Sequence, residues 1–181
     1  MSTKAQALKN GMWIGVSPTF TLSQDSALIV QSEYRIQNNV EQTLFRNTWL
    51  YALATDWRLG SGFDIFSGTN FETRIWQEIN YRHQWNGITP FVRVREEVRR
   101  AEGMDATRFR TRAMVGITYR SNLSSRLSVT LYDECFGLQT TPEGPVAMYD
   151  RNWFEGRVSI HTDKGTIHLG SMLETIKGTH L

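Results

Sequence analysis

The sequence predicts an all-β fold, and within that class a single antiparallel up-and-down transmembrane β-barrel of about ten strands, with about eight to twelve compatible with the pattern. Hydrophobic and polar residues alternate with period two through most of the chain, as in strands whose two faces meet different surroundings. The alternating segments run for about 9 to 13 residues, close to the length that a tilted membrane strand needs and longer than strands in soluble sheets. Arginine dominates the polar face, which suits an enclosed network of ion pairs better than a solvated surface.

The first half of the chain divides into five strands separated by polar turns. In the clearest of them, the charged residues Glu72, Arg74, Glu78 and Arg82 occupy even positions, while apolar residues fill odd ones. A helix would scatter these charges around its whole surface, so the strand interpretation is favoured. We place the five strands at residues 12–22, 27–37, 43–55, 58–66 and 70–85.

The second half begins with Asn86-Gly87, a dipeptide typical of tight hairpin turns. Further strands are predicted at residues 88–100, 107–119, 126–136, 153–161 and 166–176, with the stretch "TTPEGP" as a turn or loop. The barrel domain then spans residues 12–177, between an N-terminal tail of residues 1–11 and a C-terminal tail of residues 178–181. Only residues 2–9 could compete as a helix.

Composition narrows the class of protein further. With a mean hydropathy of -0.40, the chain contains no apolar run of the roughly 18 residues that a membrane helix needs, whereas a barrel hides its apolar residues in alternation. Its length of 181 residues suits one domain, and Cys135, the only cysteine, excludes an intrachain disulfide. The basic residues are interleaved with glutamate rather than clustered, so nucleic acid is not a predicted partner.

Alternation alone does not say which face points inward. In a soluble up-and-down barrel the apolar face would fill the interior and bind a small apolar ligand; in a membrane barrel the charged face lines the lumen. We favour the membrane barrel because sixteen of the twenty basic residues are arginine, because small residues share the charged face, and because aromatic residues on the apolar face fall near strand ends. These aromatic residues are Tyr34, Trp49, Tyr51, Phe71, Tyr81, Phe109 and Tyr119.

The order of several motifs resembles a bacterial family of outer-membrane β-barrels of unknown function, DUF2490. Its pattern has an E-x-R-x-W-Q strand, an R-x-R-x-E strand, an R-x-R strand, D-E-x-F and an N-x-x-x-G strand. The resemblance covers most of residues 12–176, and the matching residues are Glu72, Arg74, Trp76, Gln77, Arg93, Arg95, Glu97, Arg108, Arg110, Arg112, Asp133, Glu134, Phe136, Asn152 and Gly156. It implies a fold and a location in the bacterial outer membrane, and no established activity.

The two ends of the chain depart from what such a family leads one to expect. The start "MSTKAQALKN" has two lysines but no apolar stretch, so it is not a secretory signal peptide, and we expect a mature form with an added initial methionine rather than a cytosolic protein. The end "IKGTHL" lacks a terminal aromatic residue. Either a further strand belongs to the barrel, or residues 166–176 close it against residues 12–20.

The candidate functional site is the charged face itself. It consists of Glu33, Arg35, Arg46, Glu72, Arg74, Glu78, Arg93, Arg95, Glu97, Arg108, Arg110, Arg112, Glu134, Glu155 and Arg157. These residues could form a constriction that selects small anions or zwitterions, or a lumen filled by ion pairs that hold the barrel's shape and conduct little. We favour the second, because a barrel of about ten strands is only slightly wider than the roughly eight-stranded type that side chains fill.

A third hypothesis is a lipid-modifying enzyme that uses Ser159 and His161, on one strand face with Glu155. Serine and histidine are also ordinary lumen residues, so we expect no enzymatic activity. The four histidines show no metal-ligand spacing, and no cofactor is predicted. Expected partners are membrane lipid or detergent, together with small ions or solutes, and the sequence leaves the oligomeric state open.

Overall fold

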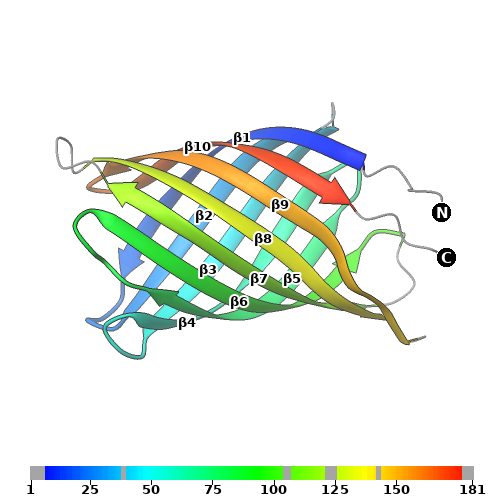
Figure 1. Ribbon diagram of the computed structural model, residues 1–181, viewed down its shortest axis with the longest axis horizontal. Helices are drawn as coiled ribbons and strands as arrows, with labels where there is room; N and C mark the ends of the chain where they lie inside the picture. Colours follow the sequence, from blue (N-terminus) through cyan, green and yellow to red (C-terminus); the bar gives the residue numbers. More distant parts are fainter. Residues whose placement is uncertain (1–6, 38–39, 104–106, 121–125, 142–143, 177–181) are drawn as a thin grey trace.

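The computed structural model describes residues 7–37, 40–103, 107–120, 126–141 and 144–176, and these form a closed antiparallel barrel of ten strands (Figure 1). The predicted fold class and strand number are confirmed. No helix in these ranges is long and apolar enough to cross a membrane. The strands are β1 (Ala7–Thr21), β2 (Ser26–Gln37), β3 (Val40–Ala52), β4 (Trp57–Gly68), β5 (Glu72–Arg82), β6 (Ile88–Ala101), β7 (Arg108–Arg120), β8 (Leu127–Thr141), β9 (Gly144–Thr162) and β10 (Gly165–Ile176).

Each strand pairs with its neighbours in sequence, and β1 pairs with β10 to close the barrel. The closing register runs from Ala7 opposite Ile176 to Pro18 opposite Gly165, so the last predicted strand does close against the first. β1 starts five residues before the predicted position, and residues 7–9 are strand rather than helix. The remainder of both predicted tails lies outside the described residues.

The two ends of the barrel are distinguished by the ends of β1 and β10. At one, here called the turn end, connections join β1 to β2, β3 to β4, β5 to β6, β7 to β8 and β9 to β10. At the other, the terminal end, β1 begins and β10 ends (Figure 1). Asn86 and Gly87 have φ values of 45° and 79°, which confirms the tight turn between β5 and β6.

At the terminal end, β8 and β9 extend beyond their predicted limits and make the longest hairpin of the barrel (Figure 1). The strands pair through most of the stretch predicted as a turn or loop, with Thr141 opposite Gly144. Register shifts at Phe136/Gly137 and Gln139/Thr140 interrupt the regular alternation here. Such irregularities locally disrupt the pairing of the two strands and the alternation of their side chains. The predicted strands, which rest on alternation, therefore end before this part of the hairpin.

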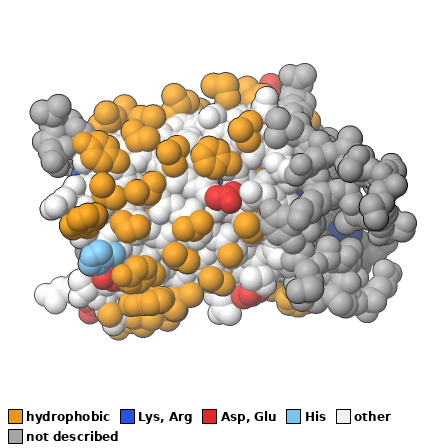
Figure 2. Space-filling view, in the orientation of Figure 1, with side chains coloured by type: hydrophobic (Ala, Val, Ile, Leu, Met, Phe, Trp, Pro, Cys, Tyr) orange, Lys and Arg blue, Asp and Glu red, His pale blue; other side chains and the backbone are white. Residues whose placement is uncertain are grey.

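The outer wall is apolar and the interior is charged. Ile75 on the outside is 69% exposed and Met12 is 64% exposed, whereas Arg95 and Glu97 inside are 2% and 1% exposed. Figure 2 shows hydrophobic side chains spread over the visible wall. The soluble barrel with an apolar interior is therefore wrong, and the inverted arrangement of a transmembrane barrel is confirmed.

Large aromatic residues gather on the outer wall near the turn end. Trp49 and Tyr51 end β3 and Trp57 begins β4, next to Tyr81 at the end of β5. The rings of Trp57 and Tyr81 lie 5.1 Å apart. Tryptophan and tyrosine prefer the membrane–water boundary, so this aromatic belt marks one edge of the apolar band.

Glycines on the inner wall make room for the bulkiest interior side chains. Gly170 pairs with Trp13 across the β1–β10 seam, and a Cβ atom at Gly170 would lie 2.4 Å from the indole. Gly62 pairs with Trp76, where the corresponding distance is 2.7 Å. Each indole therefore occupies the space that a side chain on the neighbouring strand would need.

Candidate functional site in the lumen

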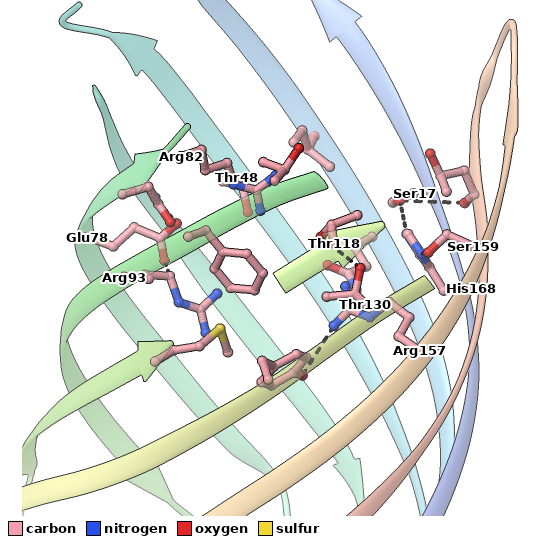
Figure 3. Close-up of a pocket in the computed structure, with 18 of the residues that line it drawn as sticks. Ser17, Thr48, Glu78, Arg82, Arg93, Thr118, Thr130, Arg157, Ser159 and His168 are labelled. Atoms are coloured by element: carbon pink, nitrogen blue, oxygen red, sulfur yellow. Dashed lines mark hydrogen bonds and ion pairs between the residues drawn. The ribbon is translucent and has the colours of Figure 1, made fainter. Parts of the chain in front are cut away.

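The lumen contains a cavity of about 960 Å³ whose lining extends from the turn end to Arg35, Phe66 and Arg74, near the terminal ends of β2, β4 and β5. Thr55, Asp56, Gln84 and Gly87, from connections at the turn end, contribute to its lining, so it opens there. We call this cavity the vestibule (Figure 3). Its deepest lining residues belong to a layer of ion pairs and aromatic rings in the middle of the barrel.

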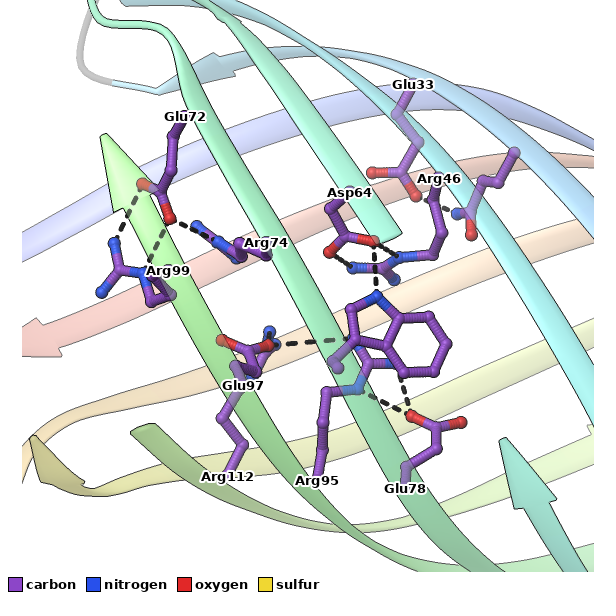
Figure 4. A network of polar contacts seen from close by, with 12 residues as sticks. Glu33, Arg46, Asp64, Glu72, Arg74, Glu78, Arg95, Glu97, Arg99 and Arg112 are labelled. Carbon is purple, nitrogen blue, oxygen red and sulfur yellow. Dashed lines mark hydrogen bonds and ion pairs between the residues drawn. The ribbon is translucent and has the colours of Figure 1, made fainter. Parts of the chain in front are cut away.

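Six residues of that layer, five of them buried, alternate in charge and form a closed circuit, here called the charge ring. They are Glu78, Arg95, Glu97, Arg112, Glu134 and Arg93, in order around the circuit. Four of them are labelled in Figure 4. Because three arginines balance three glutamates, the ring carries no net formal charge.

The contacts within the charge ring range from direct hydrogen bonds to looser ion pairs. Arg95 donates to Glu78 at 2.7 Å, Arg112 to Glu97 at 2.6 Å, and Arg93 to Glu134 at 2.8 Å. Arg112 also donates to Glu134. The Arg95–Glu97 and Arg93–Glu78 contacts are longer, at 3.9 and 3.7 Å. Four consecutive strands, β5 to β8, supply the ring, so its contacts run along the inner wall on that side of the barrel.

Aromatic rings fill the space beside these charges. The Arg95 guanidinium lies 3.9 Å from the centre of the Trp76 ring. Arg112 lies 4.8 Å from the ring of Phe136 and 5.5 Å from that of Trp153. Arginine stacked on an aromatic face is stabilised by a cation–π interaction and needs less water around it.

The ion pair of Arg46 and Asp64 lies beside Trp76 and bonds to its indole. Its indole nitrogen donates to Asp64 at 2.8 Å, and Asp64, fully buried, also accepts from Arg46 at 2.7 Å. Figure 4 shows this group beside the charge ring. Asp64 was not among the predicted site residues, although its alternation with Phe63 and Ile65 in β4 places it on the inner face.

Toward the terminal end, further charged and aromatic side chains pack beside the charge ring. Glu72 accepts from Arg74 at 2.5 Å and from Arg99 at 2.7 Å. Arg110 is 2% exposed and donates to Glu97, while Phe136 is fully buried. Among the described residues, Glu72, Glu97, Arg108 and Arg110, toward the terminal end, do not line the vestibule.

The vestibule wall carries an excess of positive charge. Ten arginines line it, against five aspartates and glutamates. Arg58, Arg82 and Arg120, near the turn end, form no ion pair with an acidic side chain among residues that the structure describes. At the mouth, these three arginines are therefore positive charges without an acidic ion-pair partner in the described part of the chain.

Two histidines on the vestibule wall bond only to hydroxyl groups among the described residues. His168 contacts Ser17 at 2.7 Å and Ser159 at 2.9 Å (Figure 3). His161 contacts Ser128 at 2.9 Å and Thr166 at 3.1 Å. Ser159 is thus bonded to His168 rather than to His161.

Glu155, the acidic residue that shares a strand face with Ser159 and His161, bonds to a different side chain. Glu155 accepts from Arg157 at 2.9 Å, and neither imidazole bonds to a carboxylate within the described ranges. A nucleophilic serine needs a base oriented by a third group, and this orienting carboxylate is not supplied to His161 or His168. Nor do three or more histidine, cysteine or acidic side chains of the described residues form a group that could hold a metal ion.

All fifteen predicted site residues lie on the inner face. Eleven line the vestibule, and Glu72, Glu97, Arg108 and Arg110 lie in the terminal half. The aromatic members of the middle layer were not predicted as site residues, because an apolar ring on a charged face gives no signal of its own. Arg58, Arg82 and Arg120 also belong to the vestibule, and their inward positions could have been read from strand alternation.

Comparison with known proteins gives a family and a fold. The model of a family described as "Protein of unknown function (DUF2490)" matches residues 10–180. No curated protein matches the chain. The solved structure of the KdgM porin is similar with a TM-score of 0.50 at 12% sequence identity, covering 95% of this chain and 99% of that one.

Two further solved structures resemble the barrel more distantly. The NanC porin matches with a TM-score of 0.48 at 10% identity, over 95% of this chain and all (100%) of that one. Neisserial surface protein A (NspA) matches with a TM-score of 0.40 at 11% identity, over 97% of this chain and 100% of that one. At such identities the likeness concerns the fold.

Proposed function

The chain belongs to the DUF2490 family of proteins of unknown function, and from this premise we propose that it is a porin-like barrel of the bacterial outer membrane with a low-conductance lumen and a vestibule for small anions. The charge ring carries the proposal. Its ion pairs would narrow the lumen on the side of β5 to β8, and displacing them would leave several buried charges unpaired.

The vestibule would be the part of the lumen that admits small anions. Small anionic solutes would enter from the turn end, where arginines without acidic partners in the described structure line the wall. The excess of arginine over acidic residues raises the local concentration of anions. A cation would meet the same field as a barrier.

Planar-bilayer recordings test the closed lumen. We expect the wild-type protein to show little conductance. The double variant Glu97→Ala/Arg110→Ala removes an ion pair from the closed half without changing the formal charge, and we expect its conductance to rise several-fold. Ile14→Ala, on the outer wall, is the matched control. Large, uniform conductance steps from the wild-type protein would refute the closed lumen.

Reversal potentials test the preference for anions. In a KCl gradient, the opened double variant should favour chloride over potassium. Replacing Arg58, Arg82 and Arg120 together by glutamine should reduce that preference at least about threefold, because it removes three positive charges from the mouth. An unchanged preference would show that these arginines do not select the solute.

A further inference from the structure

A row of polar residues crosses the outer wall where apolar residues belong. Ser61, Gln77, Glu96 and Thr111 are successive cross-strand partners on β4, β5, β6 and β7, and their side chains lie on the outer face. The Thr111 hydroxyl lies 2.8 and 2.9 Å from the two Glu96 carboxylate oxygens. We call these four residues the polar row.

The polar row lies inside the apolar band. Gln77 is four residues from Tyr81 of the aromatic belt, and along a tilted strand each residue advances about 2.5 Å toward the other side of the membrane. Gln77 therefore lies about 10 Å below the belt, within an apolar band about 25 Å tall. Ile75, Ile79, Val94 and Val98, its apolar neighbours on β5 and β6, flank the row along both strands.

The wall is hollowed beside the polar row. A groove of about 620 Å³ is lined by Trp49, Tyr51, Leu59, Ile79 and Val94, with Gly60 and Ser61 as its small members. Gln77 and Glu96 also line it. An exposed carboxylate and carboxamide beside an apolar groove are costly against lipid tails, which offer no hydrogen-bond partner.

We propose that the outer wall of β4–β7 is the contact surface for a second copy of this chain. The row places a donor, the Gln77 carboxamide, next to an acceptor, the Glu96 carboxylate, on adjacent strands. A twofold axis normal to the membrane brings Gln77 of each copy against Glu96 of the other. The surface is thus self-complementary, as a twofold dimer requires.

A lipid fits this surface less well than a second copy does. Lipid headgroups lie at the level of the aromatic belt, and the acyl chains that reach the depth of Glu96 carry no donor for its carboxylate. Polar side chains between transmembrane elements instead bond to one another across the contact. The groove beside the row gives side chains of the partner a place to pack.

Disulfide cross-linking in sparse proteoliposomes tests the contact. With Cys135→Ala as background, Val94→Cys places a thiol beside the polar row, and Ile14→Cys places one on the opposite wall, on β1. We expect oxidation to link most of the Val94→Cys protein into dimers. The cross-linked fraction of the Ile14→Cys protein should be lower by at least about tenfold. Equal linking of both would mean random collision and would overturn the proposal.

Substitutions of the polar row test its role in the contact. In the Val94→Cys background, Glu96→Leu should lower the linked fraction about tenfold, while Glu96→Gln, which keeps hydrogen bonding, should retain most of it. Asp133→Leu, which removes another acid from the outer wall on β8, should leave linking unchanged. Heat-dependent gel mobility shows that each variant folds. A Glu96→Leu protein that folds and links like its parent would contradict the proposal.

Discussion

At the scale of single residues, the interior is an arrangement of charges that depend on one another. Glu97 is 1% exposed and accepts hydrogen bonds from Arg110 and Arg112. A buried charge that loses its partner is destabilising, because water cannot replace the lost contact. Replacing Glu97 therefore removes the hydrogen-bond acceptor of two arginines at once.

We expect Glu97→Ala to lower the free energy of unfolding by about 3 to 5 kcal/mol, since two arginines would lose their shared acceptor. Urea unfolding in detergent micelles, followed by tryptophan fluorescence, measures the change. Asp163→Ala, at the exposed turn between β9 and β10, is the control and should change the free energy by less than about 0.5 kcal/mol. A loss no larger than the control's would mean that the charge ring does not stabilise the barrel.

At the scale of strands, pairs of a glycine and a large side chain determine how closely neighbours approach. Gly170 and Trp13 form such a pair at the seam between β1 and β10. Gly156, on β9, provides a contrast, because a Cβ atom there would meet only Leu131, at an ordinary distance of 3.5 Å. A side chain at Gly170 would therefore collide with the Trp13 indole, whereas a side chain at Gly156 would fit.

We expect Gly170→Ala to destabilise the barrel by about 1 to 3 kcal/mol, because the added methyl group displaces the Trp13 indole. Gly156→Ala should change stability by less than about 0.5 kcal/mol. Adding Trp13→Leu to Gly170→Ala should recover part of the loss, and thermal unfolding of the wild type, Gly170→Ala, Trp13→Leu and the double variant measures the coupling. Equal effects of the two alanine substitutions would contradict this explanation.

Much of each strand could be predicted from the sequence, because alternation of polar and apolar residues directly reports which face a side chain occupies. The position of Glu97 inside and of Val94 outside follows from that pattern. The charge ring could not be predicted, because it joins Arg93 on β6 to Glu134 on β8, over the intervening β7. Such contacts depend on register and curvature. The early start of β1 was also missed, since its first residues alternate weakly.

At the scale of the whole molecule, the barrel has a charged interior and an apolar outer wall. An apolar outer wall of this size is suited to contact with the hydrocarbon of a bilayer. Leu169 on β10 is 54% exposed and pairs with Val158 and Ile14, both also on the outer face. A position among such neighbours is in contact with acyl chains. It therefore reports directly on membrane insertion.

We expect Leu169→Arg to cost about 2 to 4 kcal/mol of stability in lipid vesicles, since a cation would face hydrocarbon. Thr55→Arg, in the turn between β3 and β4, should have little effect. Folding into vesicles, followed by protease protection and gel mobility, compares the two. Efficient folding of Leu169→Arg in buffer without lipid or detergent would contradict a transmembrane barrel.

The seam between β1 and β10 is the strand pair that joins the first and last strands of the barrel. Nine of the ten strand pairs join sequence neighbours across short connections, whereas the tenth brings Ala7 to Ile176. Until that last pair forms, the growing sheet has two open edges of unpaired backbone groups, which can join to other chains. A chain that stops before β10 would therefore leave β1 and β9 as unpaired edges, so we expect the loss of the final strand to promote aggregation.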